Sequence, residues 1–276
     1  MNTNVENNYS RLKLSLFFLP LLLSILIVAF LYTHDALRVD SLIQIQKEWF
    51  YYLNGNLSKF PRLQYNLTQL GDAFIFLSLL TIFIVYAPKL WEALISASIL
   101  SALFSSVLKE IFSVPRPAGI LNQETFVIIG RVLPGLTSSL PSGHAITIFT
   151  VLTVLMFGFT PQKKGSKFLW FVAFIFVGLM LAFTRVAIGA HFPIDVIVGS
   201  IVGYISGLAG IFLNRQINIW KWISSKKYYP VFIGLFVIAL VVVVTKIINE
   251  NLFIFYLVLI NLICSLFIIV KSYAKR

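Results

Sequence analysis

Long apolar stretches separated by short polar connections dominate the chain. Crossing the hydrocarbon of a bilayer takes about 20 apolar residues in a helix, because backbone polar groups in lipid must be satisfied within their own segment. The pattern therefore predicts an all-α polytopic membrane helix bundle. The expected spans are Leu14–Tyr32, Ala73–Tyr86, Ala93–Leu108, Ala145–Phe159, Phe168–Phe183, Ile194–Leu213, Val231–Ile248 and Leu252–Val270.

The first apolar stretch follows the basic residues Arg11 and Lys13, as the core of a secretory signal peptide would. It is longer than a typical signal core and lacks a clear small-x-small cleavage site, so we expect a retained helix. Cys264 is the only cysteine and lies in the last expected span, which excludes an intrachain disulfide.

Composition and charge agree with a membrane protein: 59% of residues are hydrophobic, 12% are charged, and the mean hydropathy is +0.91. If the amino terminus is cytoplasmic and every span crosses, the cytoplasmic side carries +11 of the net charge of +12. This asymmetry follows the positive-inside rule, so we expect both termini in the cytoplasm. Lys163–Lys164, Lys226–Lys227 and the basic tail ending at Arg276 are expected to contact lipid headgroups, and nucleic acid is not an expected partner.

Two long segments, residues 34–72 and 109–143, fall on the non-cytoplasmic side of this topology. Apolar residues recur in the first at spacings of three or four, which predicts a helix. The helix either lies flat in the membrane interface or packs as a lid over the spans. Its apolar positions are Leu42, Ile45, Trp49, Tyr52 and Leu53.

Polar residues from four distant stretches are expected at this same membrane face: Lys109, Arg116, His144, Arg185, His191 and Asp195. Ionisable residues at the membrane edge are functional candidates. The three cations have few acids near them in the sequence, which suits a dianionic phosphate. Arginine adds a planar fork that binds two oxygens at once, so metal is not needed to neutralise the charge.

His144 stands where a helix is expected to begin, directly after Pro141-Ser142-Gly143. The first backbone N–H groups of a helix have no intrahelical partner, and Gly143 lets an oxyanion approach them closely. His144 could therefore protonate a leaving oxygen of a phosphate bound there.

His191 has a carboxylate four residues later, and Pro193 suits the first position of a helix that would place Asp195 in its first turn. The carboxylate can reach one imidazole nitrogen, fix the tautomer and leave the other nitrogen free as a nucleophile.

Three blocks of the sequence closely resemble the tripartite signature of the type 2 phosphatidic acid phosphatase superfamily, whose site is related to that of vanadium-dependent haloperoxidases. The blocks are Lys109-x6-Arg116-Pro117, Pro141-Ser-Gly-His144 and Thr184-Arg185-x5-His191-x3-Asp195. The resemblance implies a six-helix phosphatase core over residues 1–213. Residues 214–276 would add a basic cytoplasmic loop and two transmembrane helices.

The resemblance also implies a role for each residue. Lys109, Arg116, Ser142, Gly143 and Arg185 would bind phosphate. His144 would be the acid and His191 the nucleophile oriented by Asp195, with no metal or other cofactor. Thr184 stands where the family usually has serine.

Taken singly, these residues have structural interpretations. Lys109 and Arg116 could be snorkelling anchors, His144 a helix cap, and His191 with Asp195 a hydrogen-bonded pair. Their order, their spacing and their shared membrane face favour one phosphate-binding site over these separate structural interpretations.

We therefore expect an integral membrane phosphatase that acts on a lipid phosphate or diphosphate through a phosphohistidine at the non-cytoplasmic face, with the active site facing the periplasm or exterior of a bacterial inner membrane. Undecaprenyl diphosphate and phosphatidylglycerophosphate are the favoured substrates. A lipid phosphotransferase, a lipid A phosphatase of the same family and a non-catalytic lipid-phosphate binder are the alternatives. The expected partners are the lipid phosphate and membrane lipids, and the oligomeric state is left open.

Overall fold

The computed structural model describes residues 1–133, 135 and 137–275, which contain helices and no strand. Arg276, which ends the predicted basic tail, lies outside this part. The α-helices are α1 (Asn2–Ser10), α2 (Phe18–Thr33), α3 (Val39–Leu57), α4 (Pro61–Thr68), α5 (Ala73–Ser78), α6 (Phe83–Tyr86), α7 (Pro88–Phe112), α8 (Pro117–Ile120), α9 (Gly143–Gly158), α10 (Lys164–Ala187), α11 (Pro193–Gln216), α12 (Tyr229–Glu250) and α13 (Phe253–Ala274). Short 3-10 turns are η1 (Leu14–Phe17), η2 (Gln69–Gly71), η3 (Gln123–Thr125), η4 (Lys221–Ser224) and η5 (Lys226–Tyr228).

Within the described residues, six helical segments are long and apolar enough to cross a membrane. They contain α2, α7, α10, α11, α12 and α13, and α9 is a further apolar helix of 16 residues. The prediction of an all-α polytopic membrane bundle is confirmed, and the chain is an integral membrane protein.

The predicted span Ala73–Tyr86 is wrong as a single helix. The structure divides it into α5 and α6 with turns between them, and α13 supplies polar partners at the break. Asn261 Nδ2 donates to the carbonyl of Ser78 at 2.8 Å, and Thr81 Oγ1 donates to Ser265 Oγ at 2.9 Å. Non-helical backbone at membrane depth is tolerated where protein covers it. The break is therefore stabilised by a helix distant in the sequence.

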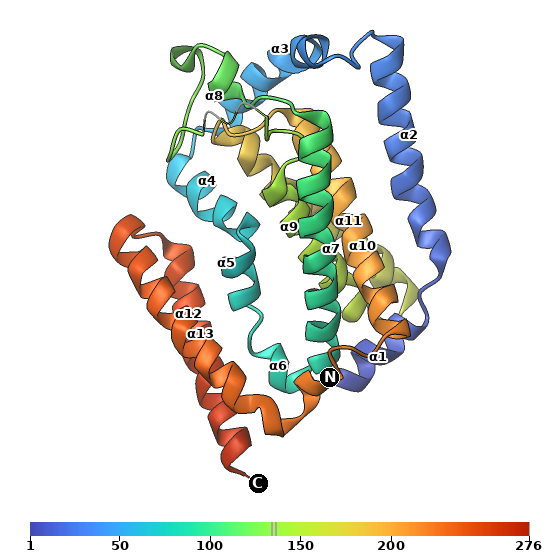
Figure 1. Cartoon of the computed structure of the whole chain (residues 1–276), viewed down its shortest axis with the longest axis vertical. Helices are drawn as coiled ribbons and strands as arrows, with labels where there is room; N and C mark the ends of the chain where they lie inside the picture. The colour runs from blue at the N-terminus through green and yellow to red at the C-terminus, as the bar shows by residue number, and fades with distance from the viewer. Residues whose placement is uncertain (134, 136, 276) are drawn as a thin grey trace.

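Helix α9 lies at the centre of the bundle, packed against α7, α10 and α11 (Figure 1). Gly199, Gly203 and Gly207 form the face of α11 that meets it. A Cβ on Gly199 would lie 2.7 Å from the carbonyl oxygen of Ser142, so a larger residue would push the two helices apart. Small residues four apart let helix backbones approach closely in membranes. This contact fixes the start of α9 beside the first turns of α11.

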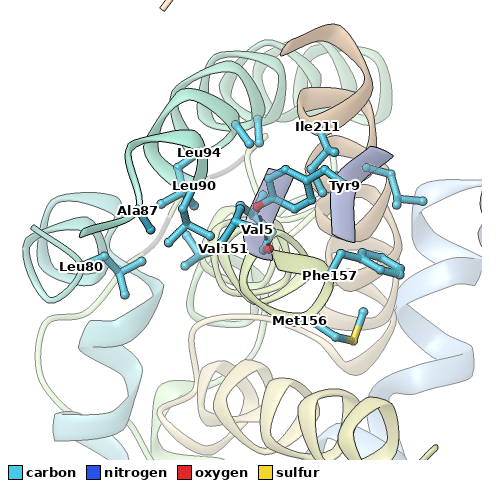
Figure 2. Close-up of a cluster of buried hydrophobic side chains, with 14 of the residues drawn as sticks. Val5, Tyr9, Leu80, Ala87, Leu90, Leu94, Val151, Met156, Phe157 and Ile211 are labelled. Carbon is cyan, nitrogen blue, oxygen red and sulfur yellow. Dashed lines mark hydrogen bonds between the residues drawn. The ribbon is translucent and has the colours of Figure 1, made fainter. Parts of the chain in front are cut away.

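The polar helix α1 packs at the end of the bundle opposite α3 (Figure 1), with Val5, Asn8 and Tyr9 buried and most of its other residues exposed. Figure 2 shows Val5 and Tyr9 among buried side chains of α7, α9 and α11. Asn8 Nδ2 donates to the carbonyl of Gly158 at the last turn of α9, at 2.9 Å. Asn2 Oδ1 accepts a backbone N–H from the first turn of α7, at 2.9 Å. Helix α1 thus satisfies helix ends that would otherwise lack partners.

The predicted helix over the spans is present as α3, which lies across one end of the bundle (Figure 1). Phe50 and Asn54 are buried, and Asn54 Nδ2 donates to the carbonyl of Val186 near the end of α10 at 3.0 Å. Trp49 and Tyr52, predicted on the same apolar face, are 64% and 63% exposed. Helix α3 therefore packs as a lid and turns two aromatic side chains outward.

The C-terminal hairpin of α12 and α13 packs against α5 and α6, with Ile75 and Ile84 buried in the shared core. Figure 1 shows the two chain termini at the same end of the molecule, away from α3. The division into a core ending at residue 213 and an added segment stays a prediction.

Candidate active site

The end of α10 sets the positions of Arg185 and His191. The N–H of Ala190 bonds to the carbonyl of Arg185 at 3.0 Å, and the N–H of Gly189 bonds to that of Val186 at 3.0 Å. This is a Schellman ending, which needs a left-handed residue, and Gly189 supplies it with φ of 75°. The N–H of His191 also reaches the Arg185 carbonyl at 3.3 Å, so the turn ties the histidine to the arginine.

Helix α9 begins at Gly143, as the sequence predicted, and Ser142 is its N-cap. Ser142 Oγ accepts the N–H of Ala145 at 3.5 Å, and the Ser142 N–H donates to the carbonyl of Asp195 at 3.0 Å. His144 packs against Gly71, where a Cβ would lie 2.5 Å from the Cβ of the histidine. The start of α9 is thus pinned to α11 on one side and to the turn before α5 on the other.

Helix α11 begins at Pro193, again as predicted, and Asp195 lies in its first turn. Asp195 is fully buried, and its Oδ2 accepts the N–H of Phe192 at 2.9 Å. Gln46 of α3 accepts the N–H of Ile194 at 3.0 Å. The sequence did not indicate a role for Gln46, because it lies more than a hundred residues from the helix that it caps.

A serine that the sequence reading gave no role stands between Asp195 and His191. Ser139 is fully buried, and its Oγ donates to Asp195 Oδ2 at 2.5 Å and lies 3.4 Å from His191 Nδ1. The direct distance from His191 Nδ1 to Asp195 Oδ2 is 3.6 Å, too long for a hydrogen bond. A hydroxyl that donates to the carboxylate can still accept a hydrogen bond from an Nδ1–H, so Ser139 can relay the orientation that the sequence assigned to direct contact.

The cations approach from α7, α10 and the loop that follows α7. Arg185 is 4% exposed, and its Nη1 donates to Thr68 Oγ1 at 3.0 Å. The Nε atoms of Arg185 and Arg116 are buried and have no hydrogen-bond partner in the described part of the chain. Lys109 Nζ lies 3.4 Å from the position that a Cβ would take on Gly143. Two buried donors and an ammonium are therefore available beside the start of α9.

His191 is 1% exposed, and its environment favours the neutral imidazole. Burial lowers the pKa of His191 well below its ordinary value, and the charges of Arg185, Arg116, His144 and Lys109 lower it further. A neutral ring keeps a lone pair on one nitrogen, as a nucleophile needs. The same interactions place all the predicted cations within electrostatic reach of this ring.

The structure thus brings together every residue predicted for the site. Thr184 does not join the phosphate donors, because its hydroxyl donates to the carbonyl of Leu181 in its own helix at 2.6 Å. Thr68 and Ser139 were missed. The only signal for Ser139 was its place two residues before Pro141, and Thr68 had none, since its contact with Arg185 depends on the fold. No cluster of three or more metal-ligating His, Cys, Asp or Glu side chains occurs among the described residues.

The fold and the site define a helical membrane protein with two histidines and a buried excess of cations at one end of its bundle. Residues 89–220 match the model of the PAP2 superfamily, and this segment contains every predicted catalytic and phosphate-binding residue. The match confirms the resemblance seen in the sequence.

The chain is also similar to named relatives. The chain is 29% identical over 154 residues to the lipid A 1-phosphatase of Rhizobium etli, covering 53% of this chain and 62% of the relative. It is 22% identical over 139 residues to the undecaprenyl-diphosphatase of Sulfolobus acidocaldarius, covering 50% and 62%. The crystal structure of LpxE from Aquifex aeolicus aligns with a TM-score of 0.49 at 27% identity, over 61% of this chain and 95% of that one. The matches thus span less than two thirds of the length of the two curated relatives.

Proposed function

We propose that the protein is a lipid phosphate phosphatase that forms a phosphohistidine at His191. The observation that carries the proposal is the pair of buried Nε donors on Arg116 and Arg185, which have no hydrogen-bond partner among the described residues, near the buried ring of His191. Buried arginine donors are satisfied well by a phosphate, whose oxygens match the guanidinium fork.

In the first step, Arg116, Arg185 and Lys109 bind the phosphate oxygens, together with backbone N–H groups at the start of α9. His191 Nε2 attacks phosphorus while Ser139 holds Nδ1. The bond from phosphorus to the lipid oxygen breaks, and His144 donates a proton to that oxygen. The products are the lipid alcohol, or a lipid monophosphate when the substrate is a diphosphate, and the phosphohistidine.

In the second step, water attacks phosphorus and His144 accepts its proton. The nitrogen–phosphorus bond breaks, inorganic phosphate leaves, and both imidazoles return to their starting states. His144 is suited to both steps because it is partly exposed, whereas His191 is buried, so the ring of His144 can meet both the leaving oxygen and the incoming water.

A lipid substrate fits the position of the site, which lies at one end of a membrane bundle, so that the tail can stay in hydrocarbon while the headgroup reaches the cations. The relatives' names, lipid A 1-phosphatase and undecaprenyl-diphosphatase, support the same class of substrate. Both termini lie at the end of the bundle opposite the site (Figure 1), and together with the positive-inside asymmetry this supports a site on the non-cytoplasmic face, which in a bacterium would be the periplasmic side of the inner membrane.

The test is release of phosphate by the purified full-length protein in detergent–lipid micelles, across a panel of lipid phosphates and diphosphates. We expect His191→Ala to lower kcat by at least about 10³-fold with lipid binding largely kept, because the covalent step is lost. Quenching the reaction with alkali should preserve a phosphohistidine on the wild-type protein. None should be found on the variant. Near-normal turnover by His191→Ala would overturn the assignment of the nucleophile.

Two further arms define the reaction. Chelators should leave the activity intact, and a complete loss that added metal restores would contradict the metal-free mechanism. Transfer of phosphate to a second lipid, in place of free phosphate, would make the protein a phosphotransferase.

A further inference from the structure

A cavity of about 320 Å³ begins at His144 and Gly143 and runs between α5, α7 and α9. Five hydroxyl-bearing residues line it: Ser98, Ser101 and Ser105 on α7, and Thr147 and Thr150 on α9. The opposite wall is apolar along α5, where Ala73 and Leu77 line it, and Asp72 lines it at the N-cap of that helix. We call this cavity the hydroxyl groove. It combines a polar wall and an apolar wall at the depth of the membrane spans.

Hydroxyls in membrane helices commonly bond to a carbonyl one turn back in their own helix. Ser24, Ser200 and Ser206 do so here, each at 2.8 or 2.9 Å. Among the described residues, no hydrogen-bond partner exists for the hydroxyls of Ser98, Ser105 and Thr147. An unpaired hydroxyl facing an apolar medium is costly, so this wall is suited to a ligand with polar groups of its own.

The groove is continuous with the phosphate site. Ser105 Oγ and Lys109 Nζ lie 3.6 Å and 3.4 Å from the same point, the position that a Cβ would take on Gly143. From Ser105 the serines continue along one face of α7 to Ser98, seven residues or ~10 Å along the helix axis. The hydroxyls therefore line the space directly beneath a phosphate bound at the start of α9.

We propose that the hydroxyl groove selects lipid phosphates whose phosphate is attached to an acylated polyol, a glycerol or a sugar. In such lipids the ester, amide or hydroxyl groups follow the phosphate within a few bonds, where Ser98 and Ser105 can hydrogen-bond to them. The apolar wall then receives the acyl chains. This inference rests on the proposed function and specifies its substrate class.

A polyprenyl phosphate meets the groove differently. Beyond its phosphate oxygen the chain contains only carbon and hydrogen, so it would desolvate the hydroxyls of Ser98, Ser105 and Thr147 and give them no partner. Discrimination of this kind comes from the polar groups that the wrong ligand leaves unpaired.

The test compares kcat/KM for dioleoyl phosphatidic acid and for a polyprenyl monophosphate, with wild type and with the double variant Ser98→Ala/Ser105→Ala. The wild type should prefer the phosphatidic acid. The double variant should lose about tenfold on phosphatidic acid, the effect of two ordinary hydrogen bonds, and gain on the polyprenyl phosphate, because the substitutions remove two hydroxyls that this chain would leave without partners.

The matched control is Ser106→Ala, which removes the same hydroxyl from an exposed position of α7 outside the groove. It should leave both substrates unaffected, and thermal unfolding should show all variants folded. A wild-type preference for the polyprenyl phosphate, or an unchanged ratio in the double variant, would overturn the inference while leaving a phosphatase. Release of phosphate from neither lipid by the wild type would instead count against the proposed function.

Discussion

Charged side chains are buried at both ends of this bundle, but among the described residues only those at one end have an oppositely charged partner. At the end where α1 packs, Glu92 is fully buried and its Oε2 accepts from Lys89 Nζ at 2.8 Å and from Asn214 Nδ2 at 3.3 Å. At the α3 end, Arg185 is almost as buried, yet its described partner is the neutral hydroxyl of Thr68.

Asp195, the acid close to these cations, does not neutralise them through an ion pair in the part of the chain that the structure describes. Asp195 accepts from Ser139 and from the N–H of Phe192, and no ion pair joins it to Arg116 or Arg185 in the described chain. A charge buried with its counterion serves the fold, whereas cations buried without one are suited to an anion from outside. Buried charges therefore stabilise the fold at the α1 end and are suited to bind an anion at the α3 end. Substitutions at each end can test this difference.

The largest effect is expected from Arg185→Gln. The change removes the charge and the forked donor at the site end, and kcat/KM should fall about 10²–10³-fold, the scale for losing one preorganised donor to a developing oxyanion. Phosphate release and vanadate inhibition would measure it. Activity within twofold of wild type, with unchanged vanadate affinity, would show that this cation is structural.

Ser139→Ala should have the next largest effect, because the serine orients the imidazole without touching substrate. By analogy with other groups that orient a reactive histidine, kcat should fall about 10–100-fold with KM little changed. Nitrogen-15 NMR of His191 should show a mixture of tautomers in the variant and one tautomer in the wild type. Ser139→Thr should restore part of kcat, and a tautomer unaffected by Ser139→Ala would contradict the relay.

At the opposite end, Lys89→Met should affect stability and leave catalysis alone. It strands the buried carboxylate of Glu92, which should cost about 2 kcal/mol and lower the Tm in detergent by several degrees. Lys89 is twenty residues before Lys109 on α7, ~30 Å along the axis, so kcat/KM should stay within twofold. The double variant Lys89→Met/Glu92→Leu should recover most of the Tm. Loss of activity at full stability would mean that this pair is more than structural.

The smallest effect is expected from Asn8→Ala in α1. It removes the buried hydrogen bond to the last turn of α9 and two half-buried ones, to Thr160 and from Gln162, and should cost about 1 kcal/mol, again with unchanged kcat/KM. Asn7→Ala, an exposed neighbour in the same helix, is the matched control and should be neutral. Equal Tm values for the two variants would show that α1 does not hold α9.

Most of the candidate site could be predicted from the sequence because its signals are local. Gly143 and Pro193 mark helix starts through the ordinary rules for the first turn, and the internal spacing of each block fixes which side chains share a turn. Ser139 could not be assigned in the same way. A serine hydroxyl has many possible partners, and the fold alone brings this one between Asp195 and His191.

By itself, the sequence determined that the chain is a membrane bundle, and where most helices lie, because burying backbone in lipid demands long apolar helices. Only the tertiary structure decided that Ala73–Tyr86 breaks into α5 and α6 and that the polar helix α1 packs against the bundle through Val5, Asn8 and Tyr9. Both depend on partners distant in the chain, Asn261 for the break and the ends of α7 and α9 for α1. A hydropathy pattern records what one segment prefers in lipid, and it cannot record which other segment will satisfy its polar groups.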